Sequence, residues 1–286
     1  MRMKIGVDSY IWSESFSEKD IWIIEKAKEM GFCCVDFAIG NPDEFPAEQV
    51  KEKLEETGMK GICTIALPHG ANPVSDDSAS RERAYEMMKK AVDICNIIDA
   101  DILGGVNYTA WGYLTGKPRT EAEWKRAVEH VRRVAQYAEK TGNVTICLEC
   151  VNRFETHILN IAEDAIRLCQ ETGEENVKVH LDCFHMIREE KSFRDPVLMC
   201  GKKYLGYVHV NENDRGIPGT GLVPFEDFFE ALKEIGYDGP VVIESFDPSF
   251  TETAANCAIW RKMAESGEEL ARKGLENLSR IAAAID

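Results

Sequence analysis

Four polar side chains, each close to the end of an apolar run, could together bind a divalent cation. They stand in the stretches TICLECVNRFE, VKVHLDCFH, GYVHVNENDR and PVVIESF, and they are Glu149, Asp182, His209 and Glu244. Three uncompensated carboxylates held close together repel one another strongly in a low dielectric. A divalent cation removes this repulsion. Oxygen-rich ligation with one imidazole suits Mn²⁺ or Mg²⁺, with Co²⁺ and Zn²⁺ also possible.

Strand alternation predicts that these side chains face a common interior. In the run 145–152, Glu149 shares a face with Thr145 and Cys147, whereas Ile146 and Leu148 point to the other face. The apolar face suits packing against helices, so Glu149 points into whatever the strand surrounds. We find no lysine or arginine at a matching inward position near these run ends, which argues against a buried ion-pair network.

More polar and aromatic residues follow the run ends. The polar ones follow the stretches that carry Glu149, Asp182 and His209, and they are Glu155, His185 and Arg215. A carboxylate accepts hydrogen bonds, a guanidinium donates them and an imidazole can do either, which suits sugar hydroxyls. The aromatic ones could supply faces on which sugars stack: Trp12, Trp111 and Phe246. We predict that these six residues bind substrate.

The elements that must position these residues alternate regularly along the chain. Short apolar runs, expected to be strands, cover 4–10, 33–40, 60–67, 101–108, 145–152, 177–184, 205–212 and 240–246. Segments with helical period, expected to be helices, cover 18–30, 47–57, 79–98, 121–141, 161–171, 188–200, 225–235 and 254–285.

This alternation, without a Gly/Ser linker, predicts one (β/α)₈ TIM barrel over residues 1–286, since about 250 residues is typical of that fold. A doubly wound open sheet would more often show a Gly-x-Gly-x-x-Gly turn after the first strand, where DSYIWSESF stands. The C-terminal extension, about 254–286, is expected to be helical and broken at Gly267. Chemistry in such barrels lies at the carboxyl ends of the strands, where the four candidate ligands stand.

Composition narrows the class of partner and compartment. The 34 Lys and Arg against 50 Asp and Glu give a formal charge of −16, which repels phosphate backbones and argues against nucleic acid. We see neither a signal peptide nor a run of membrane-spanning length, so we expect a soluble cytoplasmic protein. The ten cysteines sit mostly inside apolar runs, as buried thiols in a reducing compartment would.

Several stretches resemble the ketose 3-epimerase family, the D-tagatose/D-psicose (allulose) 3-epimerases of the xylose-isomerase-like barrels. The matching pieces are LECVNRFE (148–155), VHLDCFHM (179–186), HVNENDRGIPGTG (209–221) and VIESF (242–246), with GGVNYTAW (104–111) and AIWR (258–261) as weaker matches. Asn211 stands where glycine is expected, and Cys183 stands where threonine is usual.

The resemblance implies Mn²⁺ or Co²⁺ held by the four candidate ligands, with Glu155, His185 and Arg215 holding the O1 end of a free ketose. It also implies assembly as a dimer or tetramer. Inverting C3 of a 2-ketose means removing the proton beside the carbonyl and returning one to the opposite face. A metal chelating O2 and O3 would acidify that proton. Glu149 and Glu244, three strands apart, are predicted to act as base and acid.

Other functions of the same fold stay open. The loop RGIPGTG (215–221) could bind phosphate, which would make the chain a sugar-phosphate isomerase or epimerase, and aldose–ketose isomerisation would use similar groups. A DNA-repair endonuclease would need more histidines at the barrel mouth and a basic groove. The alternative that is not an enzyme is a barrel that binds sugar or metal without turnover. Such a barrel would be expected to lose Glu149 or Glu244 first, and both are present.

Overall fold

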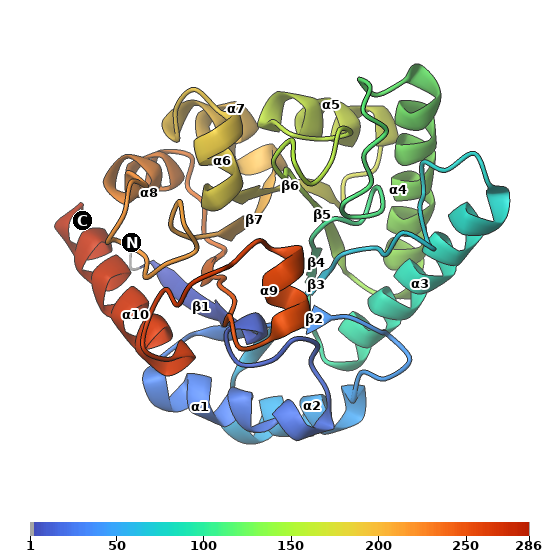
Figure 1. The fold of residues 1–286 in the computed structure, drawn as a ribbon. Coiled ribbons are helices and arrows are strands. Elements are labelled where there is room, and N and C mark those ends of the chain that lie inside the picture. Colours follow the sequence, from blue (N-terminus) through green and yellow to red (C-terminus); the bar gives the residue numbers. More distant parts are fainter. Residues whose placement is uncertain (1–2, 286) are drawn as a thin grey trace.

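The structure, a computed structural model, describes residues 3–285 as a closed barrel of eight parallel strands in chain order (Figure 1). The barrel closes because β1 pairs with both β2 and β8. Each strand lies within its predicted range, so the predicted (β/α)₈ barrel is confirmed. The strands are β1 Lys4–Asp8, β2 Cys34–Ile39, β3 Lys60–Ile65, β4 Ile102–Gly104, β5 Thr145–Glu149, β6 Val177–Asp182, β7 Leu205–His209 and β8 Pro240–Ile243.

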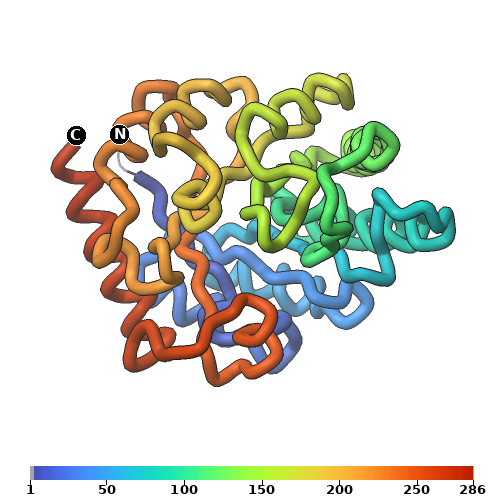
Figure 2. The backbone as a smooth tube through the Cα atoms, turned by 45° about the horizontal axis from the view of Figure 1, so that its top comes forward, coloured from blue at the N-terminus to red at the C-terminus, as the bar shows by residue number. Residues whose placement is uncertain are grey.

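Helices surround the barrel, and α10 completes the ring between α8 and α1 (Figure 1). The long helices are α1 Trp22–Met30, α2 Ala47–Thr57, α3 Ser78–Ile97, α4 Glu121–Thr141, α5 Ala162–Thr172, α7 Arg194–Tyr204, α8 Phe225–Glu234 and α10 Gly267–Ala284. The short ones are η1 Ser9–Ile11, η2 Glu18–Asp20, α6 Cys183–Glu189 and α9 Thr251–Asn256. The tilted view shows the segment with α9 lying against the chain after β1 (Figure 2).

Local signals explain why some helices coincide with their predicted ranges. At the start of α4, the Thr120 hydroxyl accepts from the N–H of Glu123 at 3.2 Å, and the Glu123 carboxylate accepts from the N–H of Thr120 at 2.7 Å. This reciprocal capping satisfies two backbone donors that a helix start otherwise leaves unpaired. At the end of α2, Gly58 adopts a φ of 65°, the left-handed conformation that favours glycine.

Two predicted helices differ from the structure. The single helix predicted over 188–200 is replaced by α6, which ends at Glu189, and α7, which begins at Arg194. Pro196 lies in the first turn of α7, where its missing N–H costs no intrahelical hydrogen bond. The predicted helical extension is interrupted over 257–266, and Gly267 is the first residue of α10 rather than a break within a helix.

The two faces of the strands form separate layers of the core. Ile146 and Leu148 pack outward in the large cluster between barrel and helices. Cys147, Tyr207 and Val242 pack with one another inside the barrel. All ten cysteines are free and most are buried, in agreement with the expected buried thiols. Among residues 3–285, no helix has the length and apolar character needed to cross a membrane.

A buried histidine on α4 gives the fold a pH-dependent stability. Burial lowers the pKa of His130 to about 3, and its Nε2 has no hydrogen-bond partner within residues 3–285. The unfolded chain therefore takes up a proton as pH falls through about 6.5, while the native chain does not until about pH 3. Stability is lost as pH falls through this window.

We expect His130→Gln to reduce the loss of unfolding free energy between pH 7.5 and pH 5.0 by about 2 kcal/mol. Urea unfolding at the two pH values measures the effect. His69→Gln, which changes an exposed histidine, is the matched control and should leave the wild-type difference in place. An equal pH dependence in His130→Gln and the wild type would contradict the prediction.

Candidate active site

The four candidate ligands meet at the carboxyl end of the barrel. Glu149, Asp182 and His209 are the last residues of β5, β6 and β7, and Glu244 directly follows β8. Asp182 pairs in register with His209. Nδ1 of His209 lies 3.6 Å from Asp182 Oδ2 and 3.6 Å from Glu244 Oε1. The ligand atoms of these three residues lie within 4.8 Å of one another, as do those of Glu149, Asp182 and His185.

The surroundings of His209 Nδ1 fit a bound divalent cation. This nitrogen is buried and has no hydrogen-bond partner among the residues that the structure describes. It faces two carboxylates at a distance too long for a hydrogen bond. One imidazole nitrogen beside several carboxylate oxygens is a donor set suited to Mn²⁺, Mg²⁺ or Co²⁺.

Arg215 enters the same site, as predicted, but it pairs with the ligand carboxylates, so the argument against a buried ion-pair network is wrong. Its guanidinium forms an ion pair with Glu244, and its Nη1 lies 3.4 Å from Asp182 Oδ2. The residue is only 5% exposed. It comes from the loop after β7, and strand alternation says nothing about where loop side chains point. A buried ion-pair network therefore uses carboxylates that could also bind a cation.

Arg215 and burial shift two carboxyl groups in opposite directions. Burial, with the charges of Glu244 and Asp182, raises the pKa of Glu149 well above its usual range. Burial would also raise the pKa of Glu244, but Arg215 and His209 hold it well below its usual range. In the protein alone, Glu149 is thus biased toward the protonated form and Glu244 toward the ionised form. Such a pair is typical of acid–base chemistry.

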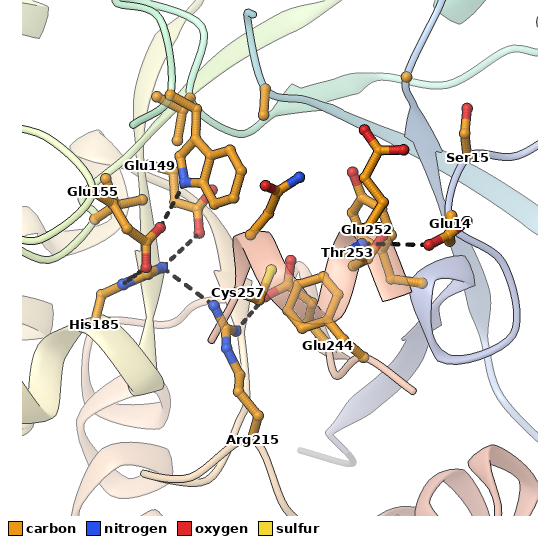
Figure 3. A pocket seen from close by; sticks show the side chains of 18 residues that line it. Glu14, Ser15, Glu149, Glu155, His185, Arg215, Glu244, Glu252, Thr253 and Cys257 are labelled. Atoms are coloured by element: carbon orange, nitrogen blue, oxygen red, sulfur yellow. Dashed lines mark hydrogen bonds and ion pairs between the residues drawn. The ribbon is translucent and has the colours of Figure 1, made fainter. Parts of the chain in front are cut away.

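A cavity of about 470 Å³ opens onto these carboxylates (Figure 3). Its lining includes seven of the eight residues predicted to bind substrate or to catalyse: Glu149, Glu155, His185, Arg215, Glu244, Trp111 and Phe246. Glu155 accepts a hydrogen bond from the Trp111 indole N–H at 2.7 Å. His185 Nδ1 accepts from the N–H of Asn152 at 3.1 Å, and its Nε2 lies 3.4 Å from Arg215 Nη2 and 3.7 Å from Glu149 Oε1.

Trp12 is the predicted substrate-binding residue that does not line this cavity. Its ring packs edge-on against Trp22, with centroids 6.3 Å apart. Trp12 ends η1, and although Tyr10 before it and Glu14 after it line the cavity, its own side chain points to α1. Closeness to a strand end in the sequence was therefore not enough to bring this ring to the site.

Sequence reasoning missed several residues in and around the site. Asp8 and Asp36 are buried carboxylates whose ligand atoms lie within 4.8 Å of one another and of His209. Asp8 is the last residue of β1, so the criterion that selected Glu149 would also have selected it. The far part of the cavity is lined by Glu14 and by Glu252 of α9, for which the sequence carries no comparable signal.

Asn211, noted as a departure from the family pattern, lies within the ligand group. Its Nδ2 donates to Asp182 Oδ2 and lies 3.4 Å from Glu244 Oε2. Its Oδ1 accepts from the backbone N–H of Glu244 at 3.0 Å. The side chain is fully buried. Asn211 therefore joins the ends of β6 and β8 and gives two crowded carboxylates a neutral donor.

Comparisons with known proteins agree with the barrel fold. The family model of xylose isomerase-like TIM barrels matches residues 24–281. A ketose 3-epimerase of Arthrobacter globiformis is 35% identical, over 94% of this chain and 93% of its own. An L-ribulose 3-epimerase of Methylomonas sp. (strain DH-1) is 33% identical over 96% of both chains. The crystal structure of a D-allulose 3-epimerase from Methylomonas sp. in complex with D-allulose is similar at a TM-score of 0.92, with 31% identity over 98% of this chain and 97% of that one.

Asn211→Asp should destabilise the metal-free protein at pH 7.5 by roughly 1–3 kcal/mol, because it replaces the shared donor with an oxygen that faces two carboxylates. Chemical unfolding in the presence of a chelator measures the change. Asn41→Asp, in an exposed turn, is the control and should have little effect. Equal stability of Asn211→Asp and the wild type would show that the amide donor contributes nothing.

Proposed function

The chain belongs to the xylose isomerase-like TIM barrel family and, within it, to the ketose 3-epimerases, and from this we propose that it is a metal-dependent enzyme that inverts C3 of free ketohexoses. D-Psicose with D-fructose, or D-tagatose with D-sorbose, are the expected pairs. One observation carries the proposal: Glu149 and Glu244 stand at the ends of β5 and β8 and line one cavity. The substrates named for the similar enzymes, ketoses, L-ribulose and D-allulose, support the substrate class.

The side chains of the site have complementary roles in this reaction. Glu244, paired with Arg215, would take the proton from C3, and Glu149 would return a proton to the opposite face. In the reverse direction the two exchange roles. His185 and Glu155 would hold the O1 end of the sugar. A bound Mn²⁺ or Co²⁺, with Mg²⁺ as a further candidate, would be held by Glu149, Asp182, His209 and Glu244 and would supply stabilisation of negative charge.

The alternative of a phosphorylated substrate is less well supported. The loop 215–221 could bind phosphate only if its backbone N–H groups were free. The N–H of Gly219 already donates to the fully buried Glu212 at 2.9 Å, and that of Gly216 donates to Asp214 at 3.0 Å. In addition, the far part of the cavity carries the carboxylates of Glu14 and Glu252. Both features disfavour a dianion, so we favour free ketoses.

Removing the metal should abolish turnover, and adding Mn²⁺ or Co²⁺ should restore it. The metal-stripped protein is incubated with D-fructose, D-psicose, D-tagatose and a ketose phosphate, with and without metal, and the sugars are separated by chromatography. Metal-dependent C3 epimers of the free ketoses are the expected products. Reaction of the ketose phosphate alone would overturn the assignment of free ketoses, and full activity after stripping would overturn metal dependence. Homodimer or homotetramer assembly and a cytoplasmic location stay predictions.

Glu149→Gln and Glu244→Gln should each lower turnover by at least about 100-fold, because either change removes one proton-transfer group. The loss of deuterium from C3 of a labelled ketose measures the proton step directly and separates an enzyme from a barrel that only binds sugar. Glu230→Gln, which changes an exposed glutamate of α8, is the control and should keep wild-type exchange. Exchange at the wild-type rate in either active-site variant would refute the assigned roles.

A further inference from the structure

The ring of His209 has its candidate metal-binding nitrogen, Nδ1, on one edge and a carboxylate contact to the other nitrogen, Nε2, on the opposite edge. Nε2 of His209 lies 3.0 Å from Asp36 Oδ2, and the Tyr207 hydroxyl donates to the same oxygen at 2.5 Å. Asp36, Tyr207 and His209 are all fully buried. Asp36 comes from β2, and the other two come from β7. The proposed reaction uses neither Asp36 nor Tyr207.

This arrangement selects one tautomer of the imidazole. An ionised carboxylate only accepts hydrogen bonds, and the Tyr207 hydroxyl already donates its proton to Asp36. A neutral His209 must therefore carry its proton on Nε2 in order to donate to Asp36 Oδ2. The other tautomer would place a lone pair against a carboxylate oxygen at 3.0 Å. With the proton on Nε2, the lone pair of Nδ1 faces Asp182 and Glu244.

Packing restricts the ring to the same orientation. The His180 ring lies edge-on to that of His209, with centroids 4.3 Å apart. The Tyr207 ring is also edge-on to His209, at 5.0 Å. An imidazole fixed by two rings and a carboxylate loses little freedom when it binds a ligand, so preorganisation favours metal binding.

We propose that Asp36 is a positioning residue that fixes His209 in the Nε2–H tautomer, with Tyr207 aligning the carboxylate, and so presents Nδ1 to a divalent cation. This inference rests on the metal site of the proposed function. A carboxylate behind a metal-binding histidine orients the ring and makes it a better ligand, and losing such a partner typically costs 10–100-fold in metal affinity. In Asp36→Asn the amide N–H can turn toward Nε2 and favour the wrong tautomer.

The first measurement is the affinity for Mn²⁺ itself, followed through the electron paramagnetic resonance signal of the free ion. Asp36→Asn should bind Mn²⁺ 10–100-fold more weakly than the wild type. Asp20→Asn is the control, because Asp20 is a buried carboxyl of η2 that accepts from the N–H of Ser17 at 3.0 Å and belongs neither to the cavity lining nor to the candidate metal groups. It should bind Mn²⁺ at least fivefold more tightly than Asp36→Asn does.

The second measurement is the imidazole N–H proton in the Mg²⁺-loaded protein, read by NMR. The wild type should show an exchange-protected downfield resonance that is absent from His209→Gln. Asp36→Asn should lose this resonance, and Asp20→Asn should keep it. A general loss of stability would not distinguish these two variants in this way. Tyr207→Phe, the second test variant, should retain the resonance at a shifted position and bind Mn²⁺ a few-fold more weakly.

The outcomes separate this inference from the proposed function. Suppose that the wild type binds Mn²⁺ and that Asp36→Asn has the same Mn²⁺ affinity and keeps the imidazole N–H resonance. Asp36 then does not position His209, while the proposed metal site stands. Should Asp36→Asn fail to fold, Tyr207→Phe with wild-type affinity and an unshifted resonance would equally overturn the inference. A wild type that binds no Mn²⁺ would overturn the metal dependence of the proposed function as well.

Discussion

The crowding of buried carboxyl groups at one end of the barrel is the constraint on which the site depends. Glu149, Asp182 and Glu244 meet there, with Asp8 and Asp36 beside them, and none is more than 7% exposed. Carboxylates removed from water lose solvation and repel one another. The barrel offsets this with a few hydrogen-bond donors and cations, unevenly placed. This uneven placement raises the pKa of Glu149 and lowers that of Glu244.

The placement of Arg215 illustrates how precisely the counter-charge is set. Its carbonyl oxygen accepts from the Ser245 hydroxyl at 2.6 Å, its N–H donates to the Glu212 carbonyl at 3.0 Å, and its guanidinium lies 3.9 Å from the centre of the Phe184 ring. The backbone takes a φ of 62°, which is uncommon for a residue with a side chain. Several elements thus combine to hold one cation against Glu244.

The reacting end and the open end of the cavity are built differently. The carboxylates and His209 stand on or directly after barrel strands, whose pairing fixes their relative positions. The far part comes from the chain after β1 and from α9, which meet where the N–H of Thr253 donates to Glu14 at 3.3 Å (Figure 3). Strands therefore fix the positions of the candidate ligands, and loops shape the open part of the pocket.

The sequence by itself determined the barrel, its eight strands and the four carboxyl-end ligand candidates, because alternation and helical period are local properties of the chain. It could not determine that Arg215 reaches Glu244, that Trp12 turns away from the cavity, or that Asp36 contacts His209 at a separation of 173 residues. Those contacts depend on loop paths and on closure of the barrel. Tertiary structure alone decided them, since closure brings β2 and β7 to face one interior although nothing in either segment specifies the other.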